Sequence, residues 1–210
     1  MQIQTARRHP LTRIAAAGAL ALAALGSLQG CVLLLGAGAV GSGLVFTDRR
    51  TSGTQLDDQS IELKSGPRVR EVLGDTGHVN VTSYNRVVLI TGEVATADDK
   101  AKVEKAISEI QNVSTVDNEL DVGFTSSISS RSNDALITTK VKSALVDAKD
   151  IQALAIKVVT ERQIVYLMGR VTEREAARAA DVARNISGVQ KVVRVFEILT
   201  EEQLGNLTNH

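Results

Sequence analysis

Residues 87–94 read Val-Val-Leu-Ile-Thr-Gly-Glu-Val, and residues 164–171 read Ile-Val-Tyr-Leu-Met-Gly-Arg-Val. Nearly every position is apolar in both copies, as expected of a strand that is covered on both faces. The flanking segments also repeat at an offset of 76 or 77 residues, which pairs Asp58 with Asp134, Val79 with Ile156, and Val113 with Val189. A repeat kept at one spacing predicts two copies of one folded unit.

Each copy has the same order of local signals. A short helical segment is followed by a strand, a tight turn at Asn85-Arg86 or Arg162-Gln163, and the apolar strand. Thr96 and Thr172 then supply N-caps for a second helix, with acidic residues in its first turn. A last strand alternates apolar and polar residues. The sequence therefore predicts an α+β protein of two tandem αββαβ modules, each a three-stranded mixed sheet with two helices on one face.

The opening helices of the two copies differ. Gly66-Pro67 interrupts the first one, where proline removes a hydrogen-bond donor and clashes with the preceding turn. The second copy has Lys142-Ser143 at the equivalent place, which allows a continuous helix. We therefore expect a shorter or kinked leading helix in the first module.

The N-terminus has the three parts of a secretory signal peptide. Three arginines precede an uncharged apolar stretch over residues 14–28, and the segment ends in Leu28-Gln29-Gly30-Cys31. These four residues resemble the lipobox of bacterial lipoproteins, whose cysteine receives a diacylglycerol and whose amine can receive a further acyl chain. We expect cleavage before Cys31, the only cysteine, with these acyl and diacylglycerol groups on Cys31 and no cofactor.

An uncleaved transmembrane anchor is the alternative, because no charged residue occurs between Arg13 and Asp48. Several glycines after Cys31 lower the helix propensity of this stretch and favour the lipoprotein. Val32 follows the cysteine where an aspartate would signal retention in the inner membrane. By the same resemblance, this favours an outer-membrane location.

The domain organisation follows from these signals. We expect a signal peptide over residues 1–30, a lipidated flexible tether over 31–56, and modules over 57–122 and 133–199. A Ser-rich mobile linker over 123–132 and a disordered tail over 200–210 complete the chain. Each module has about 65 residues, which is small but sufficient for independent folding.

The two copies resemble BON domains, notably at Gly92-Glu93-Val94 and Gly169-Arg170-Val171. The lipobox, the Gly-rich tether and the paired repeats together resemble the dual-BON lipoproteins of the outer membrane. This resemblance covers nearly all of the chain after Cys31. It implies a periplasm-facing, lipid-anchored protein that binds anionic phospholipid, concentrates at division sites and supports the integrity of the outer membrane.

The sequence contains no recognisable catalytic or metal-binding pattern. His9 lies in the signal peptide, His78 stands alone before a strand and is expected at the surface, and His210 is the last residue. A catalytic triad or a histidine-based metal site therefore lacks partners. The acid pairs Asp57-Asp58 and Asp98-Asp99 lie beside expected helix starts, where capping explains them better than acid–base catalysis. We expect no enzyme, no metal and no small-molecule substrate, and a hydrolase is the weakest alternative.

Surface charge is the remaining signal. After residue 30 the chain has 21 basic and 24 acidic residues and few aromatic ones, which argues against nucleic acid. Residues 58–121 contain 7 basic and 12 acidic residues, whereas residues 133–199 contain 11 and 8. Neutral drift is one explanation of this divergence. The other is that the second module faces an anionic surface, where each basic residue contributes about 1 kcal/mol.

The first helix of the second module carries the membrane hypothesis. Its core stripe is expected to comprise Ile137, Val141, Ala144 and Leu145. Apolar side chains that lie off this stripe beside lysines suit insertion into a headgroup layer, although single exposed apolar residues are common. The residues predicted to bind an anionic phospholipid membrane are Leu136, Lys140, Lys142 and Val146. The rival hypothesis is a protein-interaction adaptor for an envelope assembly or cell-wall machine.

Overall fold

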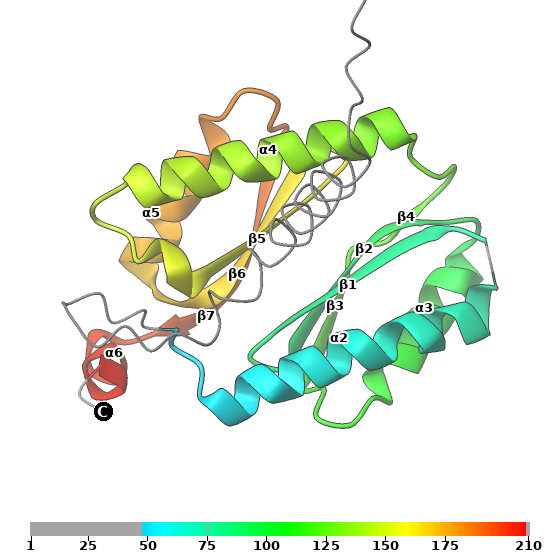
Figure 1. The fold of residues 1–210 in the computed structure, drawn as a ribbon, viewed down its shortest axis with the longest axis horizontal. Helices are drawn as coiled ribbons and strands as arrows, with labels where there is room; N and C mark the ends of the chain where they lie inside the picture. The colour runs from blue at the N-terminus through cyan, green and yellow to red at the C-terminus, as the bar shows by residue number, and fades with distance from the viewer. Residues whose placement is uncertain (1–47, 75, 209–210) are drawn as a thin grey trace, which may run out of the picture. The chain divides into compact units, whose positions relative to one another are not determined.

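A computed structural model describes residues 48–74 and 76–208 of the chain. The expected signal peptide, Cys31 and most of the tether lie outside these residues. The described part contains two copies of one α+β unit, which we call module 1 (residues 52–122) and module 2 (residues 128–199), as Figure 1 shows.

Module 1 begins with α2 (Ser52–Leu73), β1 (His78–Tyr84) and β2 (Val87–Val94), and continues with α3 (Ala97–Ser108), β3 (Thr115–Asn118) and β4 (Asp121–Val122). β1 is antiparallel to β2, whereas β3 and β4 are both parallel to it. The sheet is therefore mixed, with β2 in the middle.

Module 2 repeats this order with α4 (Ile128–Asp147), a short 3-10 helix η2 (Ala153–Ala155), β5 (Ile156–Glu161), β6 (Ile164–Thr172), α5 (Glu173–Arg184) and β7 (Lys191–Leu199). Its sheet has the order β5-β6-β7, antiparallel and then parallel. The predicted α+β fold of two αββαβ modules is confirmed, except that the last strand of module 1 is divided into β3 and β4, so its sheet has four strands and not the expected three.

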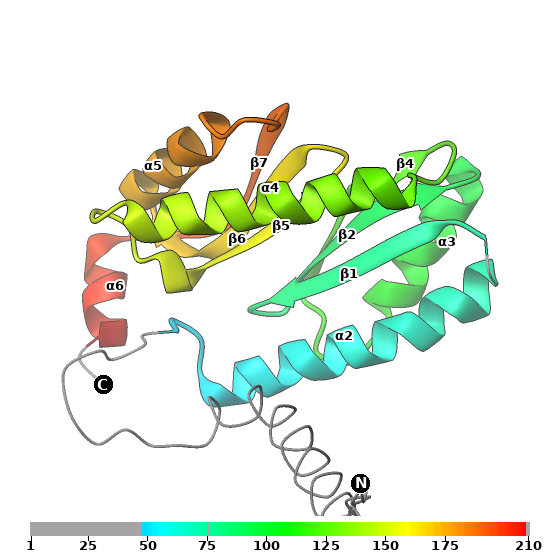
Figure 2. The ribbon, with the colours of Figure 1, turned by 45° about the horizontal axis from the view of Figure 1, so that its top comes forward.

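Both helices of module 2 cover the same face of its sheet (Figure 2). The core stripe of α4 is fully buried at Ile137, Val141 and Leu145, and Ala144 is half-buried. Across from it, α5 contributes small side chains that allow close packing: Ala176, Ala179 and Ala183. In module 1, Ile61 of α2 and Val103 and Ile107 of α3 pack in the same way on β2.

The middle strands are buried on both faces, because side chains alternate along a strand. Val165 and Leu167 of β6 face the helices, whereas Tyr166 and Met168 belong to a separate cluster. That cluster also contains Tyr84 and Leu89 of module 1. The two modules therefore share buried apolar contacts, and the expectation of independent modules on a mobile link does not match the structure.

The leading helix of module 1 differs from its prediction. α2 has 22 residues against 20 in α4 and runs through Pro67, so the expected shortening is wrong. Proline has no N–H, so the helical hydrogen bond from residue 67 to the carbonyl of Leu63 is missing. Leu63 is 78% exposed. Water can bind a carbonyl on this face, which limits the effect of the missing donor.

The structure also moves the expected boundaries of the tether, the linker and the tail. Ser52–Leu56 was assigned to the tether and belongs to α2, which Thr51 caps through its side chain. The Ser-rich linker ends early, because Ser127 caps α4 at Ile128. The expected disordered tail contains α6 (Glu201–Thr208). Serine and threonine are favoured both in linkers and at N-caps, so composition alone does not separate the two.

Candidate functional site

The outer face of α4 is the surface that the sequence singled out, and α4 spans the length of module 2 in Figure 1. Leu136 is 61% exposed and Val146 is 68% exposed, while Lys140 and Lys142 are both exposed. All four predicted residues therefore lie on the solvent side of the helix.

Helical spacing places these residues in a defined pattern. The line directly opposite the buried stripe consists of Ile128, Ser132, Leu136, Thr139, Ser143 and Val146. Lys140 flanks this line on one side and Lys142 flanks it on the other. The acidic residues of α4 are the buried Asp134 and the terminal Asp147, so the central part of the outer face has no negative charge.

The sequence interpretation missed the N-terminal part of this surface. Ile128 is 78% exposed at the first position of α4, and Phe124 just before the helix is 100% exposed. Both were assigned to the linker. Ser127 as an N-cap before an apolar residue was the signal that could have extended the helix.

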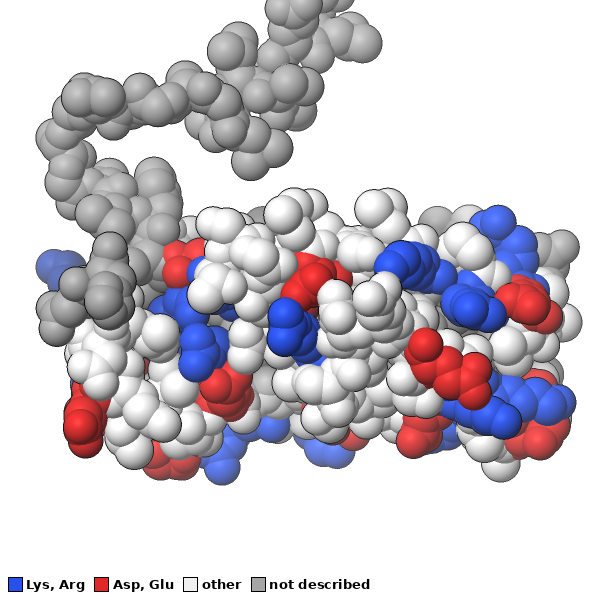
Figure 3. Space-filling view, turned by 90° about the horizontal axis from the view of Figure 1, so that it is seen from below, with Lys and Arg blue, Asp and Glu red and all other residues white. Residues whose placement is uncertain are grey.

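Module 1 also exposes leucines on its leading helix, but the charged side chains around them are of both signs. Leu56 and Leu63 of α2 are exposed. On the side of the molecule where α2 lies, basic and acidic side chains are interleaved, as Figure 3 shows. Arg68 and Glu71 of α2 form one such pair at 3.5 Å. This face therefore lacks the uniform positive flank of α4.

A buried aspartate joins each leading helix to the hairpin of its own sheet. The carboxylate of Asp58 accepts the backbone N–H groups of Asn85 and Arg86, both at 2.8 Å. These two turn residues have φ values of 53° and 65°. Asp134 accepts the N–H groups of Arg162 and Gln163 in the same way. Asp58 lies inside α2, so the capping interpretation of Asp57-Asp58 is wrong, whereas Asp98 and Asp99 do lie in the first turn of α3.

Replacing Asp134 with alanine should lower the free energy of unfolding by about 3 kcal/mol, because two turn N–H groups lose their acceptor. Urea unfolding followed by circular dichroism measures this loss. Asp181→Ala is the control, since its exposed pair with Arg184 should contribute less than about 0.5 kcal/mol. Equal midpoints for both variants would contradict the role of Asp134.

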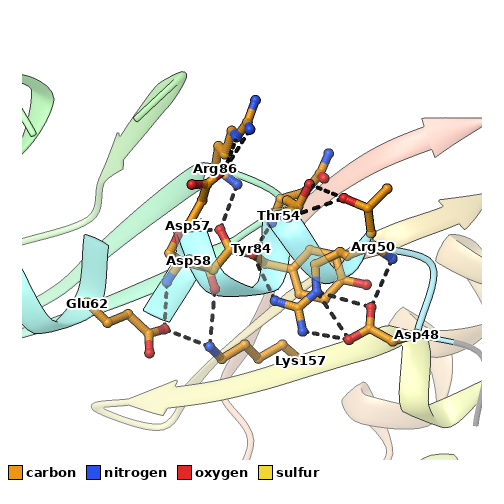
Figure 4. A network of polar contacts seen from close by, with 12 residues as sticks. Asp48, Arg50, Thr54, Asp57, Asp58, Glu62, Tyr84, Arg86 and Lys157 are labelled. Carbon is orange, nitrogen blue, oxygen red and sulfur yellow. Dashed lines mark hydrogen bonds and ion pairs between the residues drawn. The ribbon is translucent and has the colours of Figure 1, made fainter. Parts of the chain in front are cut away.

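The segment just before α2 contacts module 1, and Figure 4 shows Arg50 of this segment between Asp48 and Asp58, beside Tyr84. Arg50 forms ion pairs with Asp48 at 2.7 Å and with Asp58 of α2 at 2.8 Å. Its guanidinium lies 4.3 Å from the ring centre of Tyr84. The hydroxyl of Tyr84 donates to the carbonyl of Ala155 in module 2. Burial raises the pKa of Tyr84 to about 12, so this hydroxyl remains a donor at neutral pH.

Arg49 connects the same segment to module 2. Its guanidinium donates two hydrogen bonds of 2.8 Å to the carboxylate of Glu175, and both side chains are about 94% buried. Glu175 also completes a capping box with Thr172 at the start of α5. Sequence reasoning assigned Arg49 and Arg50 to the tether and missed this contact, which no local pattern indicates.

His78 is less isolated than the sequence suggested. Its Nε2 lies 4.0 Å from the carboxylate of Glu161 in β5, which also accepts from Asn80 at 2.9 Å. Burial raises the pKa of Glu161. Within residues 48–74 and 76–208, no group of three metal-ligating side chains forms, and no helix is long and apolar enough to cross a bilayer.

Comparisons with known proteins agree with this architecture. The BON-domain family model matches residues 67–123 and 133–200. Outer membrane lipoprotein DolP of Haemophilus influenzae is 41% identical over 175 residues, which cover 82% of this chain and 90% of the relative. The 21 kDa hemolysin of Actinobacillus pleuropneumoniae is 33% identical over 71% of this chain and 78% of its own. Osmotically-inducible protein Y of Escherichia coli is 31% identical over 50% of each chain.

Proposed function

Because the chain belongs to the BON-domain family and is a DolP-like outer-membrane lipoprotein, we propose that module 2 binds anionic phospholipid through the outer face of α4. The observation that carries this proposal is the exposed apolar line of Ile128, Leu136 and Val146 between two lysines. Coulomb attraction brings the helix to the leaflet that faces the periplasm, and the apolar side chains then hold it there. Phe124, four residues before α4, is fully exposed and is a further apolar side chain available for membrane contact.

The resemblance to dual-BON lipoproteins supports a proposed role for this contact. The protein supports the integrity of the outer membrane, at the division site, without catalysis. A two-point attachment is expected, with the acyl chains of Cys31 as one point and α4 as the other. The acyl anchor makes the binding of α4 to the same membrane intramolecular, which raises the effective concentration of the membrane surface around the helix.

Cys31 is the proposed acylation site, so Cys31→Ser should leave the precursor unprocessed or release it without lipid. Mass spectrometry of membrane fractions should find the wild-type chain starting at Cys31 with its acyl groups. An intact chain from Met1 to His210 in wild-type membranes would contradict the lipoprotein assignment.

Charge reversal on α4 tests the electrostatic contribution. Lys140→Glu with Lys142→Glu reverses four units of charge and should weaken binding to anionic vesicles more than about a hundredfold. Vesicle sedimentation with a chain that begins after Cys31 measures this binding. The matched control is Lys102→Glu with Lys105→Glu on α3 of module 1, where both lysines are also exposed. Equal losses in the two double variants would reject α4 as the contact.

A second arm of this experiment tests the apolar contribution. Leu136→Ser should weaken binding even at low salt, because it removes buried area and leaves the charge unchanged. Leu63→Ser in module 1 is the matched control, since Leu63 is also exposed on the equivalent helix, at 78% against 61% for Leu136. Val141→Ala should lower stability first and binding only as a consequence. No response of the wild-type chain to anionic vesicles would favour the protein-interaction adaptor.

A further inference from the structure

We infer that the free edge of β7 binds an extended peptide segment of a protein partner by strand addition, and that this segment carries carboxylates beside apolar residues. β7 is an edge strand in the order β5-β6-β7. It pairs with β6 along its whole length, from Ile164↔Lys191 to Thr172↔Leu199. This surface is separate from the outer face of α4.

Alternation along the strand identifies the backbone groups that are free. The two-residue turn at Arg162-Gln163 pairs Ile164 with Glu161, so the even-numbered residues of β6 direct both backbone groups to β5 and the odd-numbered ones direct theirs to β7. In the register Val165↔Val192, the backbone groups of Val165 meet those of Lys191 and Val193, so the odd-numbered residues of β7 face β6. Val192, Arg194, Phe196 and Ile198 therefore direct their N–H and carbonyl groups outward. Among the described residues, no backbone hydrogen bond outside the helices and strands uses these outward groups.

The equivalent edge of module 1 is protected. The last strand there is divided into β3, with four residues, and β4, with two, and Glu119 and Leu120 lie between them. Acidic side chains occupy this edge at Asp117, Glu119 and Asp121. Short strands, breaks and charges are the usual means of preventing strand addition. β7, in contrast, is one unbroken strand of nine residues. The two modules share a fold but differ in whether this edge is protected.

The side chains beside the edge define the chemistry of the occupant. Val193 and Val195 line one face of β7, and Val192 and Phe196 line the other, all partly buried. Lys191 and Arg194 are exposed and basic, and Arg194 also forms an exposed ion pair with Glu173 of α5 at 3.2 Å. An added strand therefore meets apolar surface on both faces and positive charge mainly near its end, at Lys191.

A second copy of β7 fits this edge poorly. It would bring the same two cations, and the acidic residue of β7 is Glu197. Glu197 already accepts hydrogen bonds from Arg170 and from Asn85. Charge complementarity therefore favours a partner that supplies its own carboxylates.

The experiment uses the mature lipidated protein in detergent micelles and two capped peptides. One peptide reads Glu-Val-Thr-Val-Thr-Val-Glu, and the other has lysine in place of both glutamates. Amide hydrogen exchange by NMR should show that the acidic peptide slows exchange at Arg194 and Phe196, with no change at β3. The lysine peptide should bind about tenfold more weakly.

Two variants separate an edge contact from other modes of binding. Arg194→Pro removes an outward donor that β6 does not use and should abolish the protection at Phe196. Arg194→Ala loses the same charge but keeps the donor, and it should retain this protection. If Arg194→Pro does not fold, an acidic peptide with N-methylated valines replaces it and should not bind. No protection at about 1 mM acidic peptide would overturn the proposal, and so would protection that rises with protein concentration alone, which indicates a second copy.

Discussion

Replacing Gly92 with alanine should lower the free energy of unfolding by more than about 3 kcal/mol, the range expected when a substitution forces the backbone to move. A Cβ at Gly92 would lie 1.9 Å from the carbonyl oxygen of His78, and the φ of Gly92 is 118°. Neither the clash nor the conformation can be relieved by rotating a side chain. Gly169 repeats the arrangement in module 2, with a Cβ 2.3 Å from the carbonyl oxygen of Ala155.

Urea unfolding of Gly92→Ala and Gly169→Ala should show this loss for both. The control is Gly66→Ala in the interior of α2, where a Cβ meets nothing within 4 Å. The same substitution should there raise stability by about 0.5–1 kcal/mol, because alanine favours a helix. A loss of similar size in all three variants would show that close approach is not the reason for glycine in the two strands.

Arg49→Ala should lower the free energy of unfolding by about 3–5 kcal/mol, because it leaves the carboxylate of Glu175 buried without its partner. Thermal or urea unfolding measures the loss. Arg178→Ala is the control, since Arg178 and Asp150 form an exposed pair that contributes about 0–1 kcal/mol.

The effect of Arg49→Ala should also depend on pH. Burial alone would raise the pKa of Glu175, but hydrogen bonds from Arg49 and Thr172 and the charge of Arg49 outweigh it and lower this pKa. The stabilisation is therefore present above the pKa of the unfolded chain and is lost as the pH falls through the folded pKa. The gap between wild type and Arg49→Ala should narrow in acid. If the difference in unfolding free energy between the two proteins stays constant as the pH falls through the folded pKa of Glu175, the loss comes from packing and not from the ion pair.

The two modules should unfold together rather than in sequence. Tyr84 and Leu89 of module 1 and Tyr166 and Met168 of module 2 form one buried cluster. Lys157 of β5 adds an ion pair to Glu62 of α2 at 2.7 Å. Two small domains with a shared apolar face stabilise each other, since each covers surface that the other would expose to water.

Local signals predicted the parts of the fold that depend on neighbouring residues. The twofold repeat, the apolar middle strands and the N-caps Thr96 and Thr172 are all confirmed. The core stripe of α4 followed from helical spacing, and so did the exposure of Leu136, Lys140, Lys142 and Val146. These features depend on the spacing of apolar residues along a helix or a strand, which a short stretch of sequence already contains.

The sequence by itself therefore determined two modules, the order of helices and strands along each, and the solvent face of α4. Only the tertiary structure decided what covers the second face of β2 and β6, where Asp58 and Asp134 direct their carboxylates, and what Arg49 binds. Asp58 acts across 27 residues to Asn85, and Arg49 acts across 126 residues to Glu175. Burial makes such contacts strong by removing water from both partners, and burial is a property of the folded chain as a whole.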